Sequence, residues 1–134
     1  MVTKITIPKS IEAALNYNEK KVQKGKAECL HAANYLTDAS QMNFYQKLNG
    51  FERLNSLNER ATTKTLHVSL NFDPSEKLSN EKLVEVANAY MEKIGFGEQP
   101  FLVYKHEDAG HPHIHIVSTT IKGDGSRINT HNIG

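Results

Sequence analysis

Cysteine and long apolar runs are scarce in this chain of 134 residues, and each shortage excludes a class of protein. The single cysteine, Cys29, excludes an internal disulfide and any zinc site built mainly from cysteine thiolates. No apolar run approaches the roughly 18 residues that a membrane-spanning helix needs, and the N-terminus lacks the apolar core of a signal peptide. We therefore expect one cytoplasmic domain that has no membrane partner.

An excess of one charge is also missing, because the formal net charge is only +1 at pH 7. A dominant phosphate-binding surface usually produces a clear surplus of lysine and arginine, so the overall charge neither proves nor excludes DNA binding. Positive charge is nevertheless concentrated near the N-terminus, in four lysines within seven residues: Lys20, Lys21, Lys24 and Lys26. Taken alone, this cluster favours the solvated end of a helix.

Apolar patterning predicts the α+β class, with an antiparallel-rich sheet and helices packed on one of its faces. Alternating or β-branched segments predict strands at residues 2–7, 65–72, 101–106 and 113–121. Helical spacing and N-cap residues predict helices from Ser10 to about 22, over 40–60, and from Ser79 or Asn80 to about 94. The alanine-rich segment AECLHAANYL, which contains Cys29, is interpreted as a few more turns of helix or a loop.

Histidines are concentrated at the predicted hairpin formed by the last two strands. His113 and His115 are two residues apart in a strand and therefore project from the same face. Closure of the hairpin through the loop EDAGHP places His106 opposite His113, where Cβ atoms are about 5 Å apart. Three imidazoles are thus within reach of one metal ion and leave open coordination positions, as a catalytic site requires.

Three further residues are expected to lie around this cluster. Asp108 is suited to hydrogen-bond the outer nitrogen of a ligating histidine. His111, which precedes a proline in the loop, is expected to support the ligands or to contact substrate rather than to bind the ion. His67 lies on the polar face of its strand, and support of the ligands or simple solvation are equally consistent with that position.

The string H-x-D-x-x-H-P-H-I-H from His106 to His115 resembles the histidine motif of relaxases, the mobilisation nucleases of the HUH endonuclease superfamily. The segment IEAALNYNEKKVQKGKA resembles the tyrosine region of the same family, a helix whose end carries tyrosine followed by a basic stretch. The tyrosine precedes the histidines, as in relaxases and unlike the order in rolling-circle replication initiators. The details look closest to the mobilisation proteins of Bacteroides-type elements.

The resemblance implies that Tyr17 is the nucleophile, which forms a 5′-phosphotyrosine bond, and that His106, His113 and His115 hold the metal ion. Asp108 would support catalysis, and the four lysines would lie beside the nucleophile where DNA phosphates must run. From the residues alone, Tyr35 and Tyr45 compete with Tyr17. Tyr104 shares a strand face with His106, although packing in the core is the favoured interpretation.

The resemblance also implies a cofactor and partners. A divalent ion is expected, either Mn²⁺ or Mg²⁺ with Zn²⁺ as an alternative, and a set of three histidines should bind Mn²⁺ more tightly than Mg²⁺. The expected substrate is single-stranded DNA at a transfer origin, with accessory DNA-binding proteins and a coupling protein as partners. Residues 1–134 would form the relaxase domain, as an N-terminal fragment of a longer protein.

Two other functions fit the same histidines. The first is a zinc-dependent hydrolase that activates water and forms no covalent intermediate. The second is a binding module that a metal ion stabilises without catalysis. Substitution of Tyr17 separates the relaxase from the hydrolase, because only the relaxase needs a tyrosine nucleophile.

Overall fold

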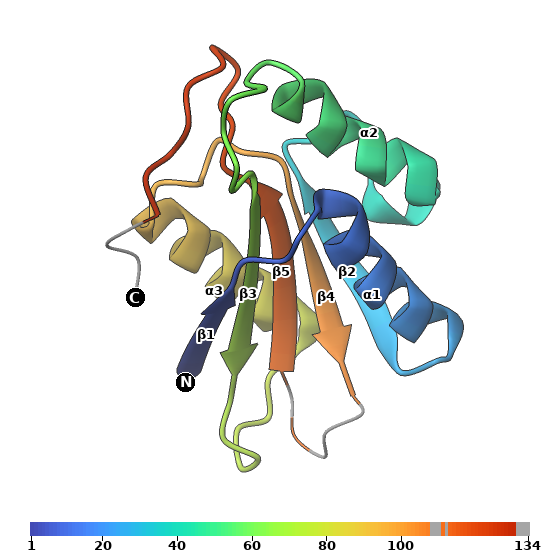
Figure 1. Cartoon of the computed structure of the whole chain (residues 1–134). Coiled ribbons are helices and arrows are strands. Elements are labelled where there is room, and N and C mark those ends of the chain that lie inside the picture. The colour runs from blue at the N-terminus through green and yellow to red at the C-terminus, as the bar shows by residue number, and fades with distance from the viewer. Residues whose placement is uncertain (108–110, 112, 131–134) are drawn as a thin grey trace.

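The computed structural model describes residues 1–107, 111 and 113–130. Within these residues, five strands form one antiparallel sheet that is covered by α-helices (Figure 1). The elements follow one another as β1 (Val2–Thr6), α1 (Ile11–Gln23), β2 (Ala27–Ala33), the 3-10 turn η1 (Ala39–Gln41), α2 (Phe44–Asn55), β3 (Thr65–Asn71), α3 (Asn80–Lys93), β4 (Phe101–His106) and β5 (His113–Thr119). The predicted α+β class and antiparallel sheet are confirmed.

The strands are ordered β1-β3-β5-β4-β2, so that β5 lies at the centre of the sheet. β4 and β5 are antiparallel neighbours, and His106 pairs directly with His113, as the hairpin prediction requires. On the other side of β5, Ser69 of β3 pairs with His115. The two histidine-bearing strands are therefore held by neighbours on both sides, which fixes the direction of their side chains.

The prediction of helix or loop for AECLHAANYL was wrong, because residues 27–33 form the edge strand β2, antiparallel to β4. Gly25 ends α1 with a positive φ of 74°, a conformation that glycine adopts without steric cost, and the chain turns back along the sheet. Pairing with β4 then outweighs the helical preference of alanine. Cys29 packs against the cluster beneath α1 and α2, and burial raises the pKa of its thiol.

Helices cover both faces of the sheet, which corrects the expectation that they pack on one face only. Leu102 and Tyr104 of β4 lie in the cluster formed with α1 and α2, whereas Phe101 and Val103 lie in the cluster formed with α3. Figure 1 shows α1 in front of the sheet and α3 behind it. The run of buried residues in β4 has no polar face, which is typical of a strand covered on both sides.

Helix boundaries follow the capping residues. Ser10 accepts a hydrogen bond from the amide of Ala13 at 3.0 Å, and Ser79 caps α3 in the same way through Lys82. The helix predicted over residues 40–60 is shorter, because Asn43 and Gln46 form a reciprocal capping box that starts α2 at Phe44. Among the described residues, every helix falls short of the length and apolar character that a bilayer span requires.

Candidate active site

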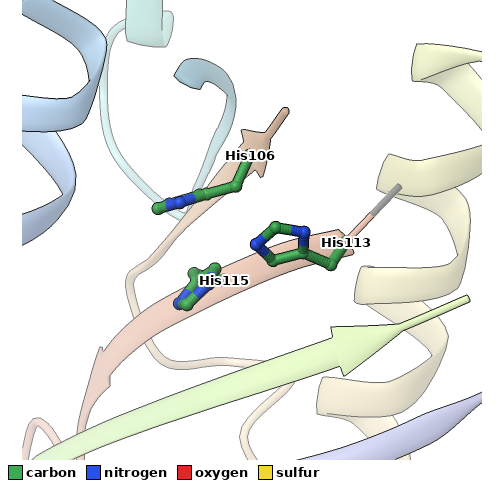
Figure 2. Close-up of side chains that lie close together, drawn as sticks. All are labelled: His106, His113 and His115. Carbon is green, nitrogen blue, oxygen red and sulfur yellow. The ribbon is translucent and has the colours of Figure 1, made fainter. Parts of the chain in front are cut away.

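Three histidines gather where β4 ends and β5 begins, on the face of the sheet that α1 covers. Figure 2 shows His106 on β4 and His113 and His115 on β5, with their imidazoles close together. One ring nitrogen from each histidine lies within 4.8 Å of those of the other two. His106 and His113 are only 1% and 7% exposed, and His115 is half-buried. Three nitrogen donors at this separation fit a first-row divalent ion.

The ring nitrogens Nδ1 of His113 and Nδ1 of His115 have hydrogen-bond partners. Nδ1 of His113 donates to the backbone carbonyl of His111 at 3.3 Å, and the two rings lie 5.4 Å apart. Nδ1 of His115 lies 3.0 Å from Nε2 of His67. A hydrogen bond on one imidazole nitrogen fixes the ring and leaves the other nitrogen for an ion. Asp108, predicted to serve the same purpose, lies outside the described residues.

Tyr17 stands over the cluster from α1. Its ring centroid is 6.2 Å from that of His67, 6.1 Å from that of His106 and 6.0 Å from that of His115. The helix buries a stripe at spacings of three and four, made of Ile11, Ala14, Leu15 and Asn18. Tyr17 flanks this stripe and is 47% exposed, so its phenol is accessible from solvent while its ring faces the imidazoles.

The competing tyrosines have other surroundings. The hydroxyl of Tyr35 donates to the carbonyl of Lys47 at 2.6 Å, and burial raises the pKa of this phenol. Tyr45 lies on α2 with its ring against Phe44, and it is 71% exposed. Tyr104 shares the face of His106 but is fully buried, with its hydroxyl bonded to Glu19 at 2.5 Å. The favoured interpretation of Tyr104 as a packing residue fits this contact.

Asn18, which was not predicted from the sequence as a site residue, is completely buried beside the histidines. Its Oδ1 lies 2.7 Å from Nε2 of His106, and its Nδ2 donates to the carbonyl of Ala14 at 2.9 Å. The available signal was an asparagine on the apolar stripe of a helix, where a polar side chain needs a partner. His67, whose role the sequence left open, belongs to the same cluster, and burial lowers the pKa of its imidazole.

The four lysines occupy the end of α1 and the turn that follows it. Nζ of Lys21 lies 5.9 Å from the centroid of the Tyr17 ring, in a cation–π arrangement. Lys20, Lys24 and Lys26 are exposed. The carbonyl of Lys26 accepts a hydrogen bond from the amide of Glu107 at 2.9 Å, which brings this turn beside the residue that follows His106. The lysine cluster therefore adjoins the histidine end of β4.

A buried polar network holds α1 against α2 and the sheet. Glu19 of α1 accepts from Nζ of Lys47 at 2.9 Å and from the hydroxyl of Tyr104 at 2.5 Å. The side chains of Lys47 and Glu19 are only 6% and 14% exposed. A buried pair of this kind is weak support for net stability, but removal of one partner leaves the other charge without compensation. The network therefore fixes the helix that carries Tyr17 and Asn18.

The comparisons with known proteins agree with this geometry. The family model for the nuclease domain of MobA/VirD2-like relaxases matches residues 17–134, a range that begins at Tyr17 and includes all three clustered histidines. Neither the search of curated proteins nor the search of solved structures found a significant match. The matched range spans most of the length of the chain. The chain therefore belongs to the relaxase family, with a nuclease domain of the MobA/VirD2-like type.

Proposed function

We propose that this protein is a metal-dependent relaxase that nicks one DNA strand at a transfer origin through a covalent bond to Tyr17. Membership of the relaxase nuclease family supports DNA nicking. The position of Tyr17 is the observation that carries the mechanism, because its ring lies 6.1 Å from that of His106, 6.0 Å from that of His115 and 6.2 Å from that of His67. Plasmid or mobile-element mobilisation is the process that this reaction serves.

His106, His113 and His115 would hold the divalent ion, because their nitrogens converge and the cluster is largely buried. When bound, such an ion neutralises a non-bridging phosphate oxygen and makes phosphorus more open to attack. Imidazole ligands favour Mn²⁺ over Mg²⁺, which prefers oxygen donors. Asp108 remains part of the proposal as a supporting residue, as does His111, whose carbonyl accepts from His113.

The phenol oxygen of Tyr17 forms a bond to phosphorus, and the bond between phosphorus and the 3′ oxygen breaks. The phenol loses its proton to solvent, and the departing 3′ oxygen takes one up to become a free 3′ hydroxyl. The 5′ phosphate stays on Tyr17, and the reverse transesterification rejoins the strand. A phenolate is a stronger nucleophile than a phenol, so positive charge near Tyr17 favours the attack.

Lys21 is suited to supply part of that charge, because its ammonium lies over the Tyr17 ring. Lys20, Lys24 and Lys26 would bind phosphates on the strand that enters the site, as exposed lysines beside a nucleophile can do. The single-stranded substrate, the accessory DNA-binding proteins and the coupling protein are inferred from the relaxase family.

The test is incubation of the protein with single-stranded oligonucleotides from candidate transfer origins and Mn²⁺, followed by a denaturing protein gel. We expect a DNA-linked band that disappears with EDTA and in Tyr17→Phe, and that persists in Tyr45→Phe. A band that survives in Tyr17→Phe contradicts the assignment of the nucleophile. Strand cleavage without any linked band, unaffected by Tyr17→Phe, would instead identify a metal-dependent hydrolase.

A further inference from the structure

We propose that Asn18 is a positioning residue that aligns the nucleophile helix with the metal ligands, by bonding His106 directly and His115 through His67. The inference rests on the proposed function, because it assumes that these histidines hold an ion. Its basis is a side chain that is completely buried, lies next to Tyr17 in the chain and contacts two imidazoles. Neither the histidine motif nor the tyrosine assigns it a role.

The orientation of the Asn18 amide is fixed by its own helix. Only the NH₂ group can donate to the carbonyl of Ala14, which lies 2.9 Å from Nδ2. The opposite orientation would place two oxygens against each other in a buried setting. Oδ1 therefore faces His106, at 2.7 Å from its Nε2.

An amide oxygen can only accept, so Nε2 of His106 must carry the hydrogen in this contact. In a neutral imidazole the lone pair then belongs to Nδ1. Asn18 thus selects one form of the ligand that is most deeply buried, at 1% exposure. An asparagine in this position acts on His106 as a backbone carbonyl does on many metal-binding histidines.

The same amide reaches the second ligand through His67. Nδ2 of Asn18 lies 3.4 Å from Nε2 of His67, and a donated hydrogen makes that nitrogen an acceptor. Nδ1 of His115, 3.0 Å from the same nitrogen, then carries its own hydrogen and leaves Nε2 with the lone pair. Nδ1 of His67 is left to donate to the hydroxyl of Thr6 at 3.4 Å. In this arrangement the single lone pair of Nε2 of His67 is shared by two donors, Nδ1 of His115 at 3.0 Å and Nδ2 of Asn18 at 3.4 Å.

Asn18 and Tyr17 are consecutive residues of one helix, so the link has a consequence for catalysis. A shift of α1 along the sheet would move the phenol and break the contact with His106 together. The nucleophile and the ligands are thereby kept in a fixed relative position. Small displacements of such groups lower the reaction rate by large factors. Glu19, the next residue, fixes the same turn through Lys47 and Tyr104.

The experiment measures Mn²⁺ affinity of the full chain by titration calorimetry for three variants. Asn18→Leu keeps the number and branching of the side-chain heavy atoms and removes both hydrogen-bonding groups, and we expect affinity to fall by about 10- to 100-fold. Asn58→Leu is the matched control, since its amide bonds the backbone at Gly125 and Ala61 instead of the cluster. His113→Ala tests the metal site itself.

The outcomes separate the inference from the function on which it rests. If His113→Ala weakens Mn²⁺ binding while Asn18→Leu leaves it unchanged, the role of Asn18 is overturned and the metal site stands. If His113→Ala has no effect, the metal site fails and the role of Asn18 fails with it. Equal weakening in Asn18→Leu and Asn58→Leu also overturns the inference.

A measurement on the unmodified protein covers the case in which Asn18→Leu fails to fold. Long-range ¹⁵N NMR of the metal-free protein identifies which ring nitrogens of each histidine carry hydrogen. We expect hydrogen on Nε2 of His106 and on Nδ1 of His115. Absence of hydrogen from Nε2 of His106 would overturn the inference, because the contact with Oδ1 of Asn18 would then have no donor.

Discussion

The ring of Tyr17 lies nearly parallel to that of His106, with centroids 6.1 Å apart and planes inclined by 18°. Tyr17 belongs to α1 and His106 is the last residue of β4, and the two rings meet because α1 packs on the face of the sheet that carries the histidine side chains. Tyr17 is half-exposed, whereas His106 is only 1% exposed. The arrangement is an accessible phenol beside a sheltered imidazole.

Metal binding should stabilise the fold only when all three ligands are present. An ion at 100 times its dissociation constant adds about 2.7 kcal/mol to the free energy of unfolding. We expect Mn²⁺ to raise the melting temperature of the unmodified protein and of Tyr17→Phe, and EDTA to reverse the shift. His115→Ala should show no shift, and an undiminished shift in that variant would remove His115 from the ligand set.

The lysine cluster should bind single-stranded DNA mainly through charge. Replacement of Lys20, Lys21, Lys24 and Lys26 by glutamine should lower the slope of log affinity against log salt concentration by about 2–3, at roughly 0.7 for each lost phosphate contact. The measurement is fluorescence anisotropy with a labelled oligonucleotide. Lys93→Gln, at the end of α3 on the other face of the sheet, is the control and should leave the slope unchanged. An identical slope in the fourfold variant would place the DNA elsewhere.

Loss of Lys47 should destabilise the fold strongly. Lys47→Met leaves the carboxylate of Glu19 buried without its partner, at an expected cost of about 3 kcal/mol in the free energy of unfolding. Lys82→Met, which breaks the exposed pair with Glu85, should cost less than about 1 kcal/mol. Urea unfolding measures both. Equal costs would show that the Glu19–Lys47 pair contributes no more than a surface pair.

Stability should decline in alkaline solution because of buried phenols. Burial, and then the nearby Cys29 and Glu19, raise the pKa of Tyr104 above its ordinary value. A group with a raised pKa in the folded state contributes its full stability below the unfolded value, about 10 for tyrosine, and loses it as pH rises above that value. Urea unfolding at pH 8 and pH 11 should show a smaller loss in Tyr104→Phe than in the unmodified protein. An equal loss would contradict this cause.

Much of the site was predictable because it depends on short-range periodicity. The spacing of His113 and His115 and the short loop after His106 determine which face the imidazoles share, and the structure has this pairing. The position of Tyr17 could not be predicted from local periodicity, because periodicity does not reveal where a helix crosses a sheet. Its position above the histidines depends on packing between α1 and β4 that no local pattern encodes.

The errors have physical causes as well. The segment around Cys29 was interpreted as helix or loop from its alanines, but the open edge of β4 stabilises it as a strand. Helices were expected on one face because the apolar run in β4 was not recognised as doubly buried. Asn18 was missed because its partners, His106 and His67, are 88 and 49 residues away in the chain.

The most direct test of Tyr17 as the nucleophile is to identify the residue that carries the DNA. After reaction with an origin oligonucleotide and Mn²⁺, nuclease and trypsin digestion leave a short nucleotide on one peptide, which mass spectrometry can locate. The nucleotide is expected on residues 10–20, a tryptic peptide that contains Tyr17 and no other tyrosine. A nucleotide on the peptide of residues 27–47, which contains Tyr35 and Tyr45, would contradict this assignment.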